Sequence, residues 1–261
     1  MNEIMNLDYG VIGNCKTAAL ISKRGSIDWL CLPSFDSPSV FTKILDNNIG
    51  GSFAIEVTDD YKVYQEYVKN TNILCTIFSS EEGSFQIVDF MPRYRTTDFD
   101  YYIPPEIYRY VRLLKGKPKF RIHYNPSMNY AQETAIHEKK ESYIKTVSCE
   151  NKRDNMYLYS SLDFDAILNS EETTLDKDEF LLLSYYQKLV MIDIDRVDLE
   201  FQRTKVYWQN WNNRSRKFHQ YNDIISRSLL ILKLMSFQES GAVIAALTTS
   251  MPETIGEVRN W

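Results

Sequence analysis

Residues 10–41 read GVIGNCKTAALISKRGSIDWLCLPSFDSPSVF and contain the signals on which the expected fold depends. Two short apolar runs, Thr17–Ser22 and Ser26–Leu32, flank the polar triplet Lys23-Arg24-Gly25. A glycine within a three-residue polar break is typical of a β-hairpin. Pro33 follows the second run and ends it. This stretch therefore predicts a hairpin near the start of the chain.

A short helix is expected directly after the hairpin. Ser37 can cap it, and Pro38 can occupy its first position, where the missing N–H costs no hydrogen bond. The sequence Asn-Asn-Ile-Gly-Gly at 47–51 would end the helix. The apolar residues between these signals have helical spacing: Val40, Phe41, Ile44 and Leu45.

Aromatic and acidic residues lie close together in this part of the chain. Trp29, Phe35 and Phe41 are near Asp28 and Asp36 in the sequence. A solvent loop would not need three large aromatic residues, so the mixture suits an aromatic wall with carboxylates at its rim. The whole chain has 18 Tyr, 13 Phe and 4 Trp. Most of them are expected to pack in β-sheets, where aromatic residues are enriched.

Size and composition exclude several classes of protein. The 261 residues can bury a sizeable core, and the net charge of −5 argues against a nucleic-acid partner. The first residues lack a basic region followed by an apolar run, and no apolar stretch approaches the length of a membrane span. None of the four cysteines belongs to a Cys-x-x-Cys pair. These features predict a cytoplasmic protein with reduced cysteines.

The central part of the chain, up to about Asp198, shows repeated alternation of apolar and polar residues. Turn clusters such as 79–83, 115–118 and 151–155 separate the runs. Many short strands without intervening helices indicate an antiparallel β-sandwich. The expected strands include Ile73–Phe78, Phe85–Phe90, Ile107–Leu114, Lys119–Tyr124, Ser142–Ser148, Met156–Leu162, Phe180–Tyr185 and Leu189–Ile194.

Helical spacing replaces this alternation after Asp198. Leu199–Trp211 is expected to form a helix, and a charged linker at 214–217 precedes a second helix that runs to Phe237. The second helix contains Leu229–Met235, which is apolar on almost every side. A helix of this kind needs neighbours on more than one side. The few residues that follow cannot supply them all, so the sequence is expected to be cut short.

Three consecutive motifs resemble the N-terminal signature of glycoside hydrolase family 15, the glucoamylase and trehalase-like enzymes. They are Tyr9-Gly-x-Ile-Gly-x-x-x-Thr-Ala-Ala-Leu20, Gly25-Ser-Ile-Asp-Trp-Leu-Cys-Leu-Pro33 and Phe35-Asp-Ser-Pro-Ser-Val-Phe41. Many members have arginine where this chain has Ser34. A weaker resemblance continues through Val88-Asp-Phe-Met-Pro92 and into the segment from Gly241 to Trp261.

The resemblance implies a mainly β fold: a large antiparallel sandwich, a linker helix and the first helix of a truncated (α/α)6 barrel. The implied divisions are a sandwich domain at 1–198, a helical linker at 199–217 and the start of the catalytic domain at 218–261. Family members invert the anomeric carbon with two carboxylates. Both are expected downstream of Trp261, so the resemblance assigns no catalytic residue to this chain.

The substrate-binding positions expected near the sugar-binding mouth are Trp29, Asp36, Thr249, Arg259 and Trp261. The resemblance places Arg259 and Trp261 just before the family's substrate motif, while the alternative for Trp29 is a place in the sandwich core. No cofactor and no metal are expected, because the three histidines are scattered. The expected partners are an α-glucan or oligosaccharide substrate and the remainder of the barrel, with no nucleic acid and no membrane.

Acidic pairs within the chain were weighed as alternative catalytic groups. Asp193 and Asp195 would lie about 7 Å apart on one face of a strand. Asp163/Asp165 and Asp98/Asp100 share this spacing, and a charged outer strand face explains all three pairs.

Three functions therefore remain open. The first is the N-terminal portion of a glucoamylase-like inverting α-glucosidase. The second is a non-catalytic sandwich that binds carbohydrate or docks the barrel, and the third is trehalase specificity within the same family.

Overall fold

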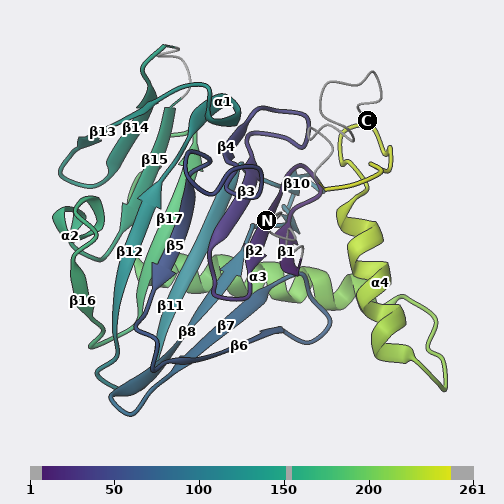
Figure 1. Ribbon diagram of the computed structural model, residues 1–261. Coiled ribbons are helices and arrows are strands. Elements are labelled where there is room, and N and C mark those ends of the chain that lie inside the picture. Colours follow the sequence, from purple (N-terminus) through teal and green to yellow (C-terminus); the bar gives the residue numbers. More distant parts are fainter. Residues whose placement is uncertain (1–7, 151–154, 248–261) are drawn as a thin grey trace, which may run out of the picture.

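The computed structural model describes residues 8–150 and 155–247. Two antiparallel β-sheets pack face to face, and helix α3 (Ile194–Asn213) lies across the outer face of the larger sheet (Figure 1). A second helix, α4 (Asn222–Leu234), stands beside the sandwich. The expected mainly β, antiparallel sandwich is confirmed. In these two described ranges, no helix is long and apolar enough to cross a membrane.

The smaller sheet has seven strands among the described residues, in the order β1-β2-β3-β5-β12-β16, and β4 pairs with β3. Its strands are β1 (Tyr9–Gly13), β2 (Ala18–Ser22), β3 (Ile27–Cys31), β4 (Ser39–Phe41), β5 (Ser52–Glu56), β12 (Lys119–Asn125) and β16 (Glu172–Thr174).

The larger sheet has eight described strands in the order β13-β14-β15-β17-β11-β8-β7-β6. They are β6 (Lys62–Tyr67), β7 (Leu74–Ser79), β8 (Gly83–Phe90), β11 (Glu106–Gly116), β13 (Ala135–Lys139), β14 (Ile144–Ser148), β15 (Asn155–Ser160) and β17 (Glu179–Tyr185). A small hairpin and two short helices complete the described elements: β9 (Tyr94–Arg95), β10 (Tyr101–Tyr102), α1 (Met128–Ala131) and α2 (Phe164–Leu168).

One hydrophobic core fills the space between the sheets, and a second lies between the larger sheet and the two long helices. Strand β11 contributes to both. Ile107 and Val111 belong to the first core, and Tyr108 and Tyr110 to the second. This division follows from the strand geometry, because successive side chains point to opposite faces. A third cluster, which we call the outer cluster, comprises Leu20, Trp29, Cys31 and Ile44.

The hairpin predicted around Lys23-Arg24-Gly25 is confirmed. Strands β2 and β3 pair antiparallel, with Leu20 opposite Trp29. Gly25 donates its N–H to the carbonyl of Ser22 at 2.9 Å and has a φ of 76°. Glycine adopts this left-handed conformation without a steric penalty, so its place in the turn has a direct backbone reason.

The prediction of a short helix beginning at Pro38 is wrong. Ser39–Phe41 forms β4, which pairs with β3. Val40 and Phe41 are buried between the sheets, whereas Ile44 lies in the outer cluster. The apolar residues of this segment therefore pack in two separate clusters, and spacing alone does not distinguish this arrangement from a helix.

The strand expected at Leu189–Ile194 is also wrong, because α3 already begins at Ile194. Asp193 is its N-cap, and the carboxylate of Asp193 accepts the N–H of Arg196 at 2.9 Å. A carboxylate here satisfies a free backbone N–H and complements the helix dipole. Asp195 lies in the first turn of the helix. The two aspartates are thus helix-start residues rather than a pair on one strand face.

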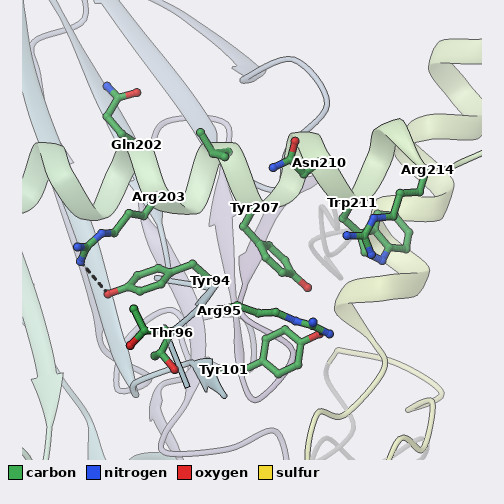
Figure 2. Close-up of a pocket in the computed structure, with 12 residues that line it drawn as sticks. Tyr94, Arg95, Thr96, Tyr101, Gln202, Arg203, Tyr207, Asn210, Trp211 and Arg214 are labelled. Atoms are coloured by element: carbon green, nitrogen blue, oxygen red, sulfur yellow. Dashed lines mark hydrogen bonds between the residues drawn. The ribbon is translucent and has the colours of Figure 1, made fainter. Parts of the chain in front are cut away.

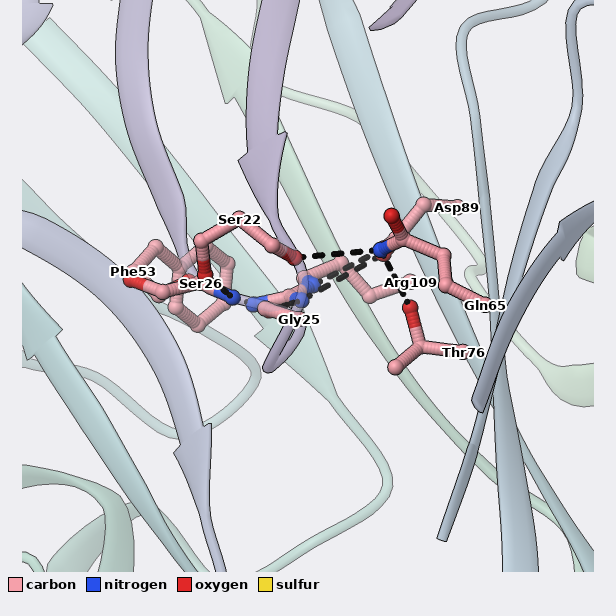
Figure 3. A network of polar contacts seen from close by, with 8 residues as sticks. All are labelled: Ser22, Gly25, Ser26, Phe53, Gln65, Thr76, Asp89 and Arg109. Carbon is pink, nitrogen blue, oxygen red and sulfur yellow. Dashed lines mark hydrogen bonds and ion pairs between the residues drawn. The ribbon is translucent and has the colours of Figure 1, made fainter. Parts of the chain in front are cut away.

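A buried ion pair within the larger sheet lies beside the hairpin turn of the smaller sheet (Figure 3). Arg109 on β11 donates its Nε–H to Asp89 on the neighbouring β8 at 2.9 Å, and neither side chain is exposed. The same guanidinium donates across the sandwich to the carbonyls of Phe53, at 2.5 Å, and Gly25. Buried charges are tolerated when paired and hydrogen-bonded, and these contacts connect β8 and β11 to the opposite sheet.

Helix α4 agrees with the helix expected to begin at Asn222 or Asp223. Leu230 and Leu234 are buried, whereas 66% of Ile224 and 54% of Leu232 are exposed. The buried side is anchored to the connection between β6 and β7, where Arg227 donates to the carbonyl of Thr71 at 2.9 Å. The exposure of Ile224 and Leu232 agrees with the expectation that some apolar side chains of this helix are not buried.

Candidate functional site

An open groove lies between the β9–β10 hairpin and α3 (Figure 2). We call it the α3 groove, and its volume is about 760 Å³. It is lined by four aromatic residues, three arginines and several smaller side chains: Tyr94, Arg95, Thr96, Thr97, Tyr101, Gln202, Arg203, Val206, Tyr207, Asn210, Trp211 and Arg214. The lining contains no carboxylate. Aromatic faces together with cationic and amide groups are suited to binding a polar ring-shaped or anionic molecule.

Local structure explains how these side chains come together. Tyr207, Asn210, Trp211 and Arg214 are three, four and seven residues apart on or just after the last turns of α3, so they share one helix face. Tyr101 comes from the opposite wall, where β9 and β10 pair with Arg95 opposite Tyr101. The groove is therefore made by a hairpin and a helix about a hundred residues apart in sequence.

A buried arginine lies behind one wall of the groove. Arg93 is fully buried, and its guanidinium carbon is 4.6 Å from the ring centroid of Tyr101 and 4.9 Å from that of Tyr207. Arg93 donates to the carbonyl of Asn14 at 2.6 Å and to the side chain of Gln238. Its hydrogen-bond acceptors are neutral, so the charge of Arg93 has no carboxylate in direct contact within the described residues.

Two buried carboxylates lie near the other end of the hairpin. Glu106, at the start of β11, accepts the hydroxyl of Tyr108 at 3.0 Å, and Glu200, on α3, accepts the hydroxyl of Tyr94 at 3.1 Å. Burial raises the pKa of both carboxyl groups, and raises that of Glu106 to about 7. The hydrogen bond from Tyr108 and the charge of Arg196 oppose the rise for Glu106, and the charge of Glu200 adds to it.

We expect the stability of the chain to fall as the pH rises from about 5 to 8 because of Glu106. Its pKa is raised in the folded state, so the folded protein binds this proton more tightly, and the stabilisation is lost as the pH rises towards 7. The raised pKa corresponds to a loss of roughly 2–3 kcal/mol from this group. Glu106→Gln should remove that part of the decline. The measurement is the free energy of unfolding in urea at about pH 5 and pH 8, for the unmodified chain and for Glu106→Gln. An equal decline in the two proteins would contradict the raised pKa of Glu106.

Trp29 lies in the outer cluster and is only 1% exposed. Phe35 belongs to the core under the helices and Phe41 to the core between the sheets, so the three aromatics do not form one wall. Asp28 is buried and accepts hydrogen bonds from Tyr9 at 3.0 Å and Ser26 at 2.5 Å. The prediction that these three aromatic side chains form one wall with carboxylates at its rim is therefore wrong.

The other expected site residues are placed as follows. Asp36 is exposed, and its carboxylate accepts the hydroxyl of Ser34 at 2.6 Å. Thr249, Arg259 and Trp261 lie outside the described residues. The structure does not bring Asp36 into any of the cavities described here.

Asp163 and Asp165 have structural roles at the start of α2 rather than on a strand face. Asp163 caps α2 by accepting the N–H of Asp165 at 2.7 Å, and Asp165 also pairs with Lys139. Within residues 8–150 and 155–247, no group of three or more histidine, cysteine, aspartate or glutamate side chains could hold a metal ion.

Sequence reasoning missed the residues of the α3 groove. Arg95 and Tyr101 lie in a short polar and aromatic segment that carries no recognised motif. The only available signal was the spacing of Tyr207 and Trp211 on the helix expected at Leu199–Trp211, because Arg214 was assigned to the charged linker. That spacing shows that the side chains share one face of the helix. It does not show which segment of the chain packs against that face.

Comparison with known proteins agrees with this architecture. The family model described as trehalase-like, N-terminal matches residues 6–171, more than half of the chain. A trehalase of Thermoplasma volcanium is 34% identical over 260 residues, which cover 97% of this chain and 41% of the relative. Trehalase 2 of Sulfolobus acidocaldarius is 32% identical over 268 residues, covering 98% and 43%. A trehalase of Mycolicibacterium smegmatis is 26% identical over 280 residues, covering 97% and 41%.

The sandwich and the family match together define the class of the protein: a β-sandwich of the trehalase-like, N-terminal type. The chain belongs to the trehalase-like, N-terminal family. This confirms the resemblance to family 15 that was carried by residues 9–41. The chain spans about two fifths of the length of these curated relatives.

Proposed function

We propose that this chain is the N-terminal portion of an inverting glycoside hydrolase that cleaves trehalose. The observation that carries this proposal is the 34% identity to a trehalase over 97% of the chain, which includes α3 and α4 as well as the sandwich. The relatives named above are all called trehalases, which favours trehalose over the α-glucans expected from the glucoamylase-like interpretation. A soluble disaccharide would then be the substrate of the whole protein.

In this proposal the hydrolytic carboxylates lie in the part of the relatives that this chain does not cover. An inverting enzyme needs one carboxyl group as acid and one as base, about 6.5–9.5 Å apart with room for a water. The α3 groove is lined by no carboxylate. Glu106 and Glu200 are buried in contacts with tyrosines, so a glycosidic bond could not approach them without rearrangement.

The role that we assign to this chain is to fold and support a catalytic barrel whose first helix is α4. Its exposed apolar residues Ile224 and Leu232 are the surface on which further barrel helices would pack. The opposite side of α4 is fixed to the sandwich by Arg227, whose guanidinium lies 3.9 Å from the ring centroid of Tyr67. The sandwich would thus set the position of the barrel.

The expected substrate-binding residues Trp29, Asp36, Thr249, Arg259 and Trp261 remain part of this proposal. Because Trp29 is buried, it would support the site from within the outer cluster rather than stack on a sugar. Met235 and Leu247 line a cavity of about 300 Å³ together with Leu20 and Ile44 of that cluster. A cytoplasmic location is also proposed, supported by the free thiols of Cys15, Cys75 and Cys149.

We expect the purified 261-residue chain to release no glucose from trehalose, maltose or starch. The reason is that the α3 groove is lined by no carboxylate and that the buried Glu106 and Glu200 are held by tyrosines. Glucose release over many hours, compared with a blank from a parallel purification, is the measurement. If turnover persists and disappears in Asp193→Asn or Asp195→Asn, the assignment of these residues to the start of α3 would be incomplete and the pair would be catalytic.

A further inference from the structure

We propose that the α3 groove is a binding site for a sugar phosphate, in which arginines hold the phosphate and aromatic rings hold the sugar. This inference rests on the groove itself and is independent of the proposed trehalase function. It concerns a site formed entirely by described residues of the sandwich portion and its first long helix.

The charge of the groove favours an anion. Arg95, Arg203 and Arg214 line it, and its lining includes no acidic side chain, although the whole chain has a net charge of −5. The charge of Arg203 is partly neutralised by Glu200. Nη1 of Arg203 lies 3.3 Å from Oε1 of Glu200. Arg95 donates to a phenol, that of Tyr101, rather than to a carboxylate. An arginine without an acidic partner is well suited to bind a phosphate through paired hydrogen bonds.

The buried Arg93 strengthens this preference. Its guanidinium is stacked behind the rings of Tyr101 and Tyr207, and its Nε has no hydrogen-bond partner within the described residues. A buried charge acts through a medium of low polarity, so water screens its field less than it screens the field of a surface charge. The field of Arg93 therefore reaches the groove through two of the side chains that line it.

Tyr101 supplies a hydrogen-bond donor at the same place. Its hydroxyl oxygen accepts a hydrogen bond from Arg95 at 3.1 Å, which leaves the hydroxyl proton free to be donated. The neighbouring arginines Arg95 and Arg93 lower the pKa of this phenol, against the effect of burial. A phenol with a lowered pKa is a stronger donor to an anionic oxygen. Figure 2 shows Arg95 and Tyr101 side by side at the lower wall of the groove, opposite Tyr207.

The rest of the lining suits a sugar ring rather than a bare phosphate. Tyr207 and Trp211 are only partly buried, so their faces are available for the apolar side of a pyranose. Gln202, Asn210 and Thr96 can exchange hydrogen bonds with its hydroxyl groups. The volume of about 760 Å³ exceeds the needs of a phosphate ion and lies within the range of small-molecule sites.

Isothermal titration calorimetry of the 261-residue chain with glucose 6-phosphate, inorganic phosphate and glucose tests this proposal. We expect glucose 6-phosphate to bind most tightly and glucose to bind at least about tenfold more weakly, because it lacks the charge-assisted hydrogen bonds. Arg95→Gln and Arg214→Gln should each weaken glucose 6-phosphate by about tenfold. Arg24→Gln is the matched control, since Arg24 is an exposed arginine in the β2–β3 turn, and it should leave binding unchanged.

Three results would overturn the proposal. The first is the absence of heat with glucose 6-phosphate at millimolar concentration. The second is an equal loss of affinity in Arg24→Gln and Arg95→Gln, which would indicate a general charge effect. The third is equal affinity for inorganic phosphate and glucose 6-phosphate, which would show that the rings contribute nothing and that no sugar is recognised. Trp211→Ala should weaken glucose 6-phosphate while leaving the affinity for inorganic phosphate unchanged.

Discussion

Replacing Arg109 with methionine should lower the free energy of unfolding by roughly 3–5 kcal/mol, the usual cost of removing one partner of a buried ion pair. The substitution leaves the carboxylate of Asp89 fully buried without its cation. It also removes the hydrogen bonds to the carbonyls of Phe53 and Gly25, which connect the two sheets. Urea unfolding followed by far-ultraviolet circular dichroism measures the loss.

Arg112→Met is the matched control, because Arg112 is on the same strand but its ion pair with Asp178 is partly exposed. Such a pair contributes about 0–1 kcal/mol, so the control should unfold close to the unmodified chain. The double variant Arg109→Met, Asp89→Leu should recover part of the loss, since it leaves no unpaired buried charge. Equal effects of Arg109→Met and Arg112→Met would contradict the structural role of the buried pair.

Trp208→Ala is expected to cost about 3–5 kcal/mol, as is usual for the loss of a large aromatic side chain from a core. Trp208 is fully buried in the core between the larger sheet and the two long helices. Its loss should release α3 from the sheet, and α4 with it, because both helices share this core.

Hydrogen exchange resolved by segment separates this effect from general unfolding. Amides of α3 should lose protection in Trp208→Ala, while those of β2 and β3 should keep most of theirs. Trp211→Ala, which removes a partly buried ring from the same helix, should show a smaller effect. Uniform loss of protection in both sheets and in α3 would instead mean that the helix and the sandwich unfold as one unit.

The hairpin at residues 17–32 could be predicted from sequence because its signals are local. Gly25 occupies a backbone conformation that favours glycine, and short apolar runs of strand length flank it. Strand β11 could also be predicted from sequence. Its successive side chains point to opposite faces of the larger sheet and pack in two separate cores. In each case the residues that form the element also carry the signal.

The segment 38–45 could not be predicted because its structure depends on distant partners. Val40 and Phe41 are held in a strand by packing between the sheets, and this tertiary contact overrides the local helical spacing. At Asp193 the error had a different origin. An aspartate that caps a helix looks the same in sequence as one on a strand, and only the bond to the N–H of Arg196 distinguishes them.

The candidate site was the least predictable part for the same reason. The groove combines a hairpin near residue 100 with a helix near residue 207, and no local pattern connects them. Arg93 could not be recognised as buried from its sequence, because arginine is usually exposed. Conversely, Trp29 was expected at a sugar site partly because of its acidic neighbours, and Asp28 is instead buried in contacts with Tyr9 and Ser26.

Trehalose hydrolysis by a chimera tests most directly whether this chain is the N-terminal portion of a trehalase. This chain would replace the matching N-terminal two fifths of the Thermoplasma volcanium trehalase, joined at the end of the aligned region. We expect the chimera to hydrolyse trehalose, whereas neither the 261-residue chain nor the remaining part of the relative should do so alone. A chimera that is folded and monodisperse by circular dichroism and light scattering, yet releases no glucose from trehalose, would contradict it.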